Sequence, residues 1–174
     1  LALVPDIHED DIVFMSDVDE IWNKVILSYD FSCPVKLNMT QYFWNLNWQV
    51  PNHCNRGSRP VRARYSDLHE NRPQELRAKN MQLVGRPGWH FSFLNPLDLG
   101  KTKIEAFAHT EYDKPDYKDI ARIRYRIEYG IDPFSRFPLK FRNIDWTYPE
   151  FVQAHPEEID HLLYKGNAFN ARVD

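Results

Sequence analysis

An apolar run that ends directly in an acidic cluster is the strongest constraint on the fold of this chain. Residues 12–15 (IVFM) lead through Ser16 into the sequence DVDE at 17–20. A short continuous apolar run bounded by turn-forming residues is typical of a buried strand, usually a parallel one. Open α/β sheets bind ligands just beyond the carboxyl ends of such strands. We therefore expect Asp17 and Asp19 to belong to a ligand site.

The chemistry of paired aspartates leaves three interpretations open. Their oxygens are hard ligands that suit Mg²⁺ or Mn²⁺, and such a metal can bridge to a diphosphate, as in nucleotide-sugar transferases. A phosphatase of the haloacid dehalogenase type would instead use Asp17 as the nucleophile. That class usually has Thr or Val where this chain has Glu20, and a later acidic pair that is not evident here. The third interpretation is a solvated acidic turn that caps a helix.

Local patterns predict alternating strands and helices, and hence an α/β fold. Besides the first strand, we expect strands over 35–39, 41–48, 61–65 and 89–93 and helices over 20–29, from Asn71, over 116–129, and from Thr147 and Pro156. Residues 103–108 fit either a strand or the start of a helix.

The helix over 116–129 has the clearest pattern. Asp116 is expected to cap its start, and Ile120, Ile123 and Ile127 to form its apolar face. Gly130 then supplies a left-handed C-terminal residue. Arg122, Arg124 and Arg126 are expected on the exposed face.

Length and charge narrow the function classes. A chain of 174 residues fits one domain, residues 1–174. A net charge of −3, from 22 basic and 25 acidic residues, gives no global field for nucleic acid or an anionic membrane. The sequence contains no apolar run long enough for a membrane-spanning helix. Its two cysteines match neither a disulfide framework nor a metal-site spacing.

Three segments in order resemble glycosyltransferase family 17, the β-1,4-mannosyl-glycoprotein β-1,4-N-acetylglucosaminyltransferases and their microbial relatives. The run DIVFMSDVDEI at 11–21 is similar to the family's DxD segment, and GWHFSF at 88–93 to its GWH-aromatic-S segment. Lys103-Ile104 followed by AHTE at 108–111 resembles the K-I…H-x-E stretch of microbial members.

The resemblance implies a GT-A-like, Rossmann-like α/β sheet with flanking helices that transfers N-acetylglucosamine from UDP-GlcNAc with inversion. It implies Mn²⁺, or Mg²⁺, held by Asp17, Asp19 and a late histidine, here His90. The alternative for His90 is a core histidine bonded to a backbone carbonyl. On this basis Asp17, Asp19, Glu20 and Trp89 are assigned to cofactor and donor binding, although Trp89 is also a natural core residue.

An inverting transferase needs a base near the acceptor hydroxyl. Glu111 is the candidate, with His109 beside it, and Asp113, Asp67 and Glu105 are rivals. Arg56, Arg59, Arg62 and Arg64 could clamp a diphosphate, but an arginine run is more often a solvated loop and strand edge. A carbohydrate-binding module without catalysis is the remaining alternative, for which the aromatic content of 14% suffices.

The resemblance also leads us to expect a fragment. The chain opens with Leu1 and reaches its first predicted strand almost at once, whereas the family has an upstream segment that supplies the first half of the nucleotide-binding sheet. Any membrane association would come from sequence outside this chain. The expected partners are a nucleotide sugar and a glycan acceptor, in the Golgi lumen for a eukaryotic member and the cytoplasm for a microbial or viral one.

Overall fold

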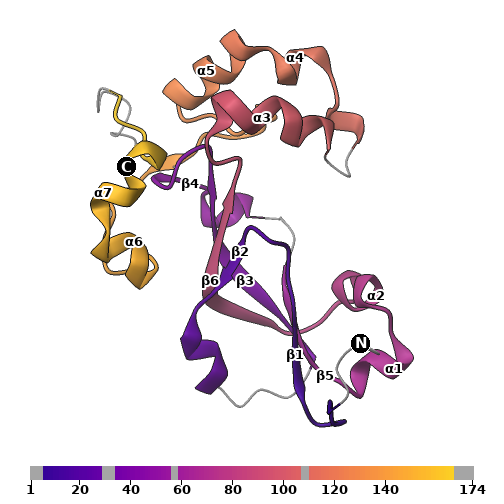
Figure 1. The fold of residues 1–174 in the computed structure, drawn as a ribbon. Coiled ribbons are helices and arrows are strands. Elements are labelled where there is room, and N and C mark those ends of the chain that lie inside the picture. Colours follow the sequence, from indigo (N-terminus) through magenta and orange to yellow (C-terminus); the bar gives the residue numbers. More distant parts are fainter. Residues whose placement is uncertain (1–5, 29–33, 56–58, 107–109, 167–174) are drawn as a thin grey trace. The chain divides into compact units, whose positions relative to one another are not determined.

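A computed structural model of the chain describes residues 6–28, 34–55, 59–106 and 110–166 (Figure 1). The chain divides into two compact units, each made of two stretches. Unit 1 comprises Leu1–Met39 and Gly57–Trp89, and unit 2 comprises Thr40–Arg56 and His90–Asp174. Two strands, β3 (Val35–Phe43) and β6 (Leu83–Ser92), contribute residues to both units.

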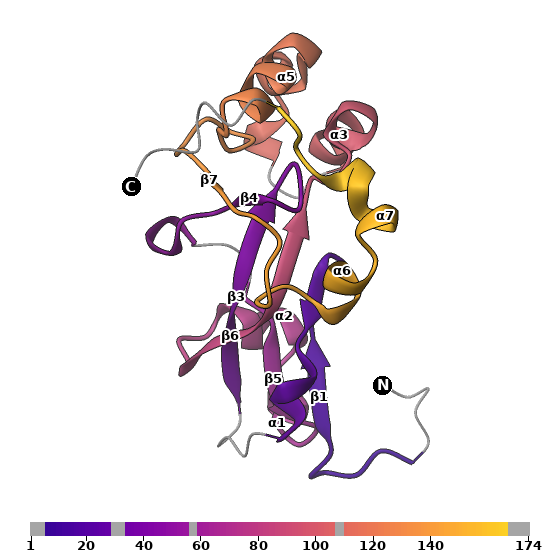
Figure 2. The ribbon, with the colours of Figure 1, turned by 90° about the vertical axis from the view of Figure 1, so that its left-hand side faces the viewer.

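The described part of unit 1 consists of strands, one 3₁₀ helix and two short α-helices. Its other elements are β1 (Ile12–Met15), β2 (Glu20–Trp22), the 3₁₀ helix η1 (Lys24–Ser28), β5 (Val61–Arg64), α1 (Asp67–Glu70) and α2 (Pro73–Ala78). Strand β5 lies between β1 and β3 and is antiparallel to both, while β2 pairs with β6. Figure 2 shows β1 and β5 side by side, with Val13 opposite Ala63 in the register.

Two apolar clusters hold unit 1 together. In one, Val61 and Ala63 of β5 pack against Leu76 of α2, which fixes that helix beside the strand. In the other, Ile26 of η1 packs against Val35 and Leu37 of β3. All of these side chains are almost completely buried. Because each cluster joins residues that are distant in sequence, burial of apolar surface sets the positions of η1 and α2.

Unit 2 combines a small antiparallel sheet with a group of helices. Its elements are β4 (Trp48–Gln49), η2 (Asn52–Cys54), α3 (Pro96–Glu105), η3 (Thr110–Tyr112), α4 (Pro115–Lys118), α5 (Ile120–Glu128), β7 (Lys140–Phe141), α6 (Glu150–Ala154), α7 (Pro156–Ile159) and η4 (Asp160–Leu162). Strand β4 pairs with β3 on one side and with β7 on the other.

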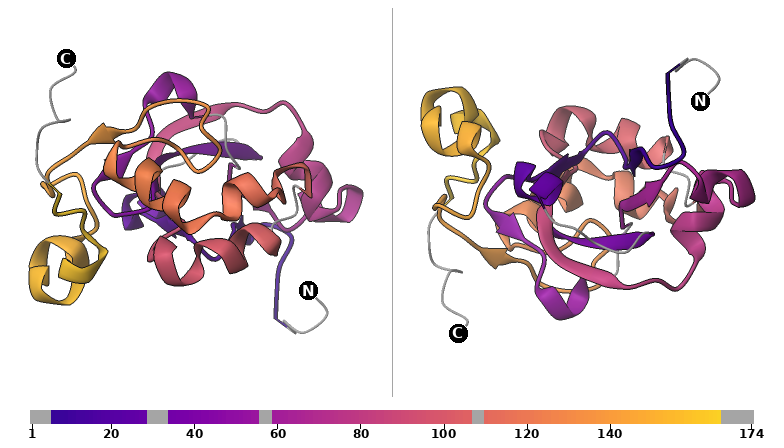
Figure 3. Two further views of the ribbon diagram at one scale, coloured as in Figure 1. Left: turned by 90° about the horizontal axis from the view of Figure 1, so that it is seen from above. Right: turned by 90° about the horizontal axis from the view of Figure 1, so that it is seen from below.

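Helices α3, α4 and α5 contact one another, and Figure 3 shows them grouped when the chain is viewed from above. Ile104 of α3 and Ile123 of α5 are almost fully buried. They belong to an apolar core that also contains residues of the sheet and of the loop after α5. The other members of this core are Phe43, Trp44, Trp48, Val50, Phe93, Phe134 and Leu139. The mixture of strands and helices confirms the coarse α/β class, whereas the GT-A-like, Rossmann-like arrangement of the sheet stays a prediction.

The first predicted strand differs from expectation in both burial and direction. The strand forms as β1, but it is antiparallel to β5 and lies at the end of the strand order, with side chains that are exposed or part-buried. The predicted helix over 20–29 is wrong for its first residues and confirmed in part for the rest, and Tyr29 lies outside the described residues. Residues 20–22 form β2 and residues 24–28 form η1, because pairing with β6 competes with local helix propensity.

The helix predicted over 116–129 is split into α4 and α5 at Asp119. This residue has an extended backbone, and its side chain accepts a hydrogen bond from the Arg122 backbone N–H, so Asp119, not Asp116, caps the longer helix. Gly130 has the predicted left-handed conformation, with φ of 58°. Ile123 is buried as expected, but Ile120 is exposed and Arg126 is buried.

The other elements follow the sequence more closely. The strands expected over 35–39 and 41–48 are one continuous strand, β3, which ends before Trp44 at a positive φ of 67°. The segment at 103–108 is the end of helix α3 through Glu105. Strand β5, helix α2 with Pro73 in its first turn, and helices α6 and α7 confirm the predictions.

Candidate functional site

The acidic cluster forms a tight turn between β1 and β2. The backbone N–H of Glu20 donates to the carbonyl oxygen of Asp17 at 3.1 Å, and the Glu20 carboxylate accepts from the Asp17 backbone N–H at 2.7 Å. The Glu20 side chain is fully buried, whereas Val18 at the tip is fully exposed. Glu20 therefore fixes the shape of the turn, and a contact between Glu20 and a donor stays a prediction.

Arg77 of α2 binds the Asp17 carboxylate through both terminal nitrogens. Nη1 donates to Oδ1 at 2.7 Å and Nη2 donates to Oδ2 at 3.0 Å, the bidentate geometry of strong arginine–carboxylate pairs. Nη2 also lies 3.7 Å from Oε2 of Glu20. The hydrogen bond with Asp17 raises the pKa of Arg77, so the acidic turn holds a permanently charged cation.

Helix α2 is positioned by its neighbours to present Arg77 to the turn. Its first turn is closed by the Glu75 carboxylate, which accepts from the Arg72 backbone N–H at 2.8 Å. Leu76, next to Arg77, is buried against β5. Sequence reasoning considered the arginines at 56–64 and missed Arg77. Of that run, Arg64 pairs with Asp10 at 2.6 Å, Arg62 is buried, and Arg56 lies outside the described residues.

The Gly88–Trp89 segment of β6 lies directly beside β2. A β-carbon on Gly88 would lie 2.1 Å from the backbone oxygen of Ile21 and 3.1 Å from Cε of Met39, so a side chain does not fit at position 88. Strand β2 begins at Glu20, the last residue of the acidic cluster. Two segments identified separately in the sequence are therefore neighbours within unit 1. Trp89 is part-buried, and its stacking on a sugar stays a prediction.

His90 begins the second stretch of unit 2. Its side chain is part-buried, and its Nδ1 lies 3.4 Å from Nε2 of Gln41 on β3, at the long end of the hydrogen-bond range. Asp17 and Asp19 belong to unit 1. The proposed metal set of Asp17, Asp19 and His90 thus draws on both units and stays a prediction.

Glu111, the candidate base, is exposed and lies in η3. Its neighbour Tyr112 stacks on Phe134, with ring centroids 4.0 Å apart and an interplanar angle of 23°. The Arg136 guanidinium lies over the same two rings, 5.8 Å from the Tyr112 centroid and 5.0 Å from that of Phe134. The segment that carries Glu111 is therefore held by aromatic stacking to the loop that follows α5.

A fully buried carboxylate organises that loop. Asp132 accepts from the Phe134 backbone N–H at 2.7 Å and from Nε of Arg136 at 2.9 Å. Buried Arg126 donates to Oγ of Ser135 at 2.9 Å and connects the loop to α5. Burial lowers the pKa of Arg126. Charged groups thus fix the loop against which Tyr112 is stacked.

The other candidates for the base lie in different parts of the chain. His109 lies outside the described residues. Asp113 pairs with Lys118 at 2.7 Å and Glu105 approaches the same lysine at 3.5 Å. Asp67, in unit 1, accepts from the Arg64 backbone N–H at 2.8 Å. Each of these carboxylates has a local structural partner, and the assignment of the base to Glu111 stays a prediction.

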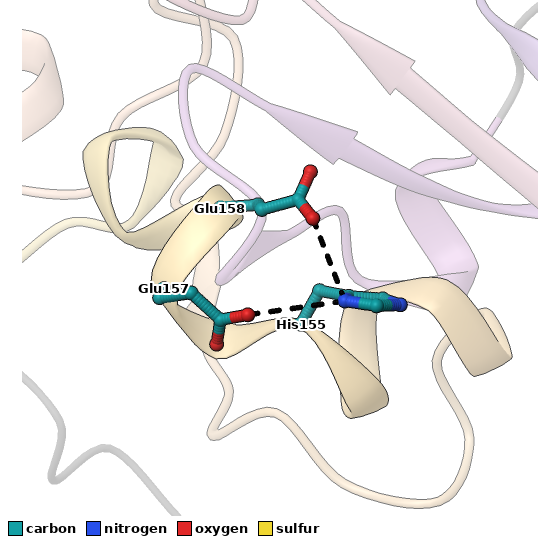
Figure 4. A group of neighbouring side chains, drawn as sticks. All are labelled: His155, Glu157 and Glu158. Atoms are coloured by element: carbon teal, nitrogen blue, oxygen red, sulfur yellow. Dashed lines mark ion pairs between the residues drawn. The ribbon is translucent and has the colours of Figure 1, made fainter.

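One group of three side chains in the described part of the chain has ligand-type atoms within 4.8 Å of one another, and it was not predicted. It consists of His155, Glu157 and Glu158 at the start of α7 (Figure 4). Nδ1 of His155 lies 3.8 Å from Glu157 and 3.5 Å from Glu158. Both glutamates are exposed, and we interpret the group as local ion pairs at a helix start.

Comparison with known families decides the class of the protein. The family model described as Glycosyltransferase family 17 matches residues 2–155. The chain belongs to this family. The match includes the acidic turn, the Gly88–Trp89 segment and Glu111, and it makes the chain a glycosyltransferase with a sugar donor and an acceptor as its ligands. Comparisons with curated proteins and with solved structures gave no significant match.

Among the residues described, none of the helices is long and apolar enough to cross a bilayer.

Proposed function

We propose that the chain is an inverting family 17 transferase that moves N-acetylglucosamine from UDP-GlcNAc to a sugar hydroxyl of a glycan acceptor. The observation that carries the proposal is the adjacency, within unit 1, of the acidic turn and the Gly88–Trp89 segment. A nucleotide-sugar site needs carboxylates for a metal and a surface for the sugar. These two segments supply both residue types side by side.

The chemistry of the acidic turn fits a divalent cation such as Mn²⁺ or Mg²⁺. Its donors are carboxylate oxygens, which hard cations prefer. The turn already holds one cation, because the Arg77 guanidinium binds both oxygens of Asp17. In the proposal Asp17 and Asp19 hold the metal with His90 as a further ligand. When bound, the metal would offset the negative charge that develops on the departing diphosphate.

The protein's own groups would orient the reactants and move one proton. Trp89 would stack on the apolar face of the donor sugar. Glu111 would accept the proton of the acceptor hydroxyl while its oxygen bonds to the anomeric carbon, with His109 as the second candidate for this transfer. The bond from that carbon to the diphosphate oxygen breaks on the opposite face, and UDP leaves with the bonding electrons. Attack opposite the leaving group inverts the anomeric configuration.

Two earlier alternatives are weakened by these findings. Family membership favours the transferase over a phosphatase and over a binding module without catalysis. In addition, both oxygens of Asp17 accept hydrogen bonds from Arg77, which makes this carboxylate a poor nucleophile. Covalent trapping of Asp17 by beryllofluoride would support the phosphatase. Sugar binding that is insensitive to EDTA, without turnover, would support the binding module.

The deciding experiment measures UDP release from UDP-GlcNAc with and without Mn²⁺, together with UDP binding by calorimetry. We expect metal-dependent release, and we expect Asp19→Ala to abolish Mn²⁺-dependent UDP binding with an unchanged circular dichroism spectrum. Asp10→Ala is the control, because Asp10 is an exposed carboxylate of the same unit whose partner is Arg64. Unchanged UDP affinity in the Asp19→Ala variant would refute the metal site.

A further inference from the structure

We infer that Arg77 exchanges partners when substrate binds, releasing Asp17 to the metal and binding the diphosphate of the donor. The inference rests on the proposed function and assigns a role to a residue that no local sequence pattern singles out. In the unloaded protein, Arg77 is the internal counter-ion of the acidic turn. During donor binding it becomes a phosphate-binding residue.

The geometry makes Arg77 a competitor of the metal. Both oxygens of Asp17 are engaged by Arg77, at 2.7 and 3.0 Å. A divalent cation at Asp17 would lie close to the guanidinium, and the two positive charges would repel each other. Metal and Arg77 therefore compete for Asp17, and metal binding favours departure of the arginine.

The released guanidinium matches the ligand that arrives with the metal. A phosphate presents a pair of oxygens that an arginine fork binds bidentately, in the same way as it binds a carboxylate. The Arg77 side chain is 25% exposed, so part of it is in contact with solvent. A small rotation of the side chain exchanges one pair of acceptor oxygens for another and keeps its charge compensated.

The turn has closing hydrogen bonds of its own, although the Glu20 carboxylate also lies 3.7 Å from Nη2 of Arg77. Its two closing hydrogen bonds run between Asp17 and Glu20, and the Glu20 side chain is fully buried. Helix α2 is held by Leu76 in the core. Removal of the guanidinium should therefore leave a folded turn with a carboxylate that is more available to a metal.

The test compares Arg77→Gln with the wild-type protein in two calorimetric titrations. With MnCl₂ alone, the variant should bind Mn²⁺ about fivefold more tightly, because a part-exposed ion pair no longer competes. With UDP in saturating Mn²⁺, the variant should bind about tenfold more weakly, because a charge-assisted bidentate contact is lost. Arg64→Gln, which removes the Arg64–Asp10 pair of the same unit, should change neither affinity.

The opposite signs of the two changes distinguish exchange from a structural role. If both affinities fall together, or if neither changes while the wild-type protein binds Mn²⁺ and UDP, the exchange is wrong and the proposed function stands. If the wild-type protein binds neither Mn²⁺ nor UDP and releases no UDP from UDP-GlcNAc, the proposed function and the exchange both fail.

Discussion

Gly88 and Ile21 approach so closely that no side chain fits between their strands. A β-carbon at position 88 would lie 2.1 Å from the Ile21 backbone oxygen, far inside van der Waals contact. This contact sets the distance between β6 and β2, and so between the Gly88–Trp89 segment and the acidic turn. The packing of β6 against β2 therefore requires glycine at position 88, whether or not a ligand is bound.

Gly88→Ala should destabilise the protein and loosen the β2–β6 pair. Because the obstructing atom belongs to the backbone, the strands must separate, and we expect a loss of about 1–3 kcal/mol in the free energy of unfolding. Urea denaturation measures this loss. Gly85→Ala is the matched control on the same strand, since a β-carbon at position 85 meets nothing within 4 Å. Equal effects at both positions would contradict the close approach.

Asp132 should tolerate truncation poorly. Its carboxylate is fully buried and accepts from the Phe134 backbone N–H and from Arg136. Asp132→Ala removes these acceptors and leaves the buried Phe134 backbone N–H unpaired, which should cost about 1–3 kcal/mol. Asp132→Asn keeps one acceptor oxygen and should cost less. Thermal denaturation tests this order, and the reverse order would refute the assigned contacts.

His90→Gln separates a metal ligand from a structural histidine. An amide oxygen is a weaker ligand than imidazole toward Mn²⁺, so we expect the Mn²⁺ affinity to fall about 10–100-fold. Stability without metal should stay within about 1 kcal/mol of wild type, because glutamine can still hydrogen bond to Gln41. Calorimetry and urea denaturation measure the two quantities. A large loss of stability with unchanged Mn²⁺ affinity would make His90 a structural residue.

Asp145 should make the free energy of unfolding depend on pH in the acidic range. Hydrogen bonds from the Thr147 hydroxyl and backbone N–H lower the pKa of Asp145. The pKa of an Asp in the unfolded chain is about 3.9. The stability that Asp145 contributes is therefore fully present above that pH. It is lost as the pH falls through the lower pKa that Asp145 has in the folded protein. The difference in urea midpoint between wild type and Asp145→Asn should therefore shrink below about pH 4. A difference that stays constant down to pH 3 would exclude this role.

Sequence reasoning succeeded where the structure depends on neighbouring residues. The left-handed Gly130, the buried Ile123 and Pro73 in the first turn of α2 all follow from local rules of helix formation. The family was also identified correctly, from the order of three segments along the chain.

Contacts between residues that are distant in sequence could not be predicted from local patterns. Arg77 is separated from Asp17 by 60 positions, and no local pattern connects the two. The pairing of β2 with β6 likewise replaced the helix expected from Glu20, because a strand partner far along the chain satisfied its backbone groups. Arg126 was misplaced for a related reason, since Asp116 and Ser135 surround it only after α4 and the loop have folded.

The division of the chain into two units, each made of two stretches that alternate along the sequence, has a consequence for synthesis on the ribosome. Thr40–Arg56 belongs to unit 2 but is translated before the rest of that unit, which begins at His90. Unit 1 is complete once Trp89 has emerged, whereas the apolar side chains of Tyr42, Trp44 and Trp48 must wait for core partners made later. Nascent chains halted shortly after residue 89 should therefore expose these aromatics and bind chaperones.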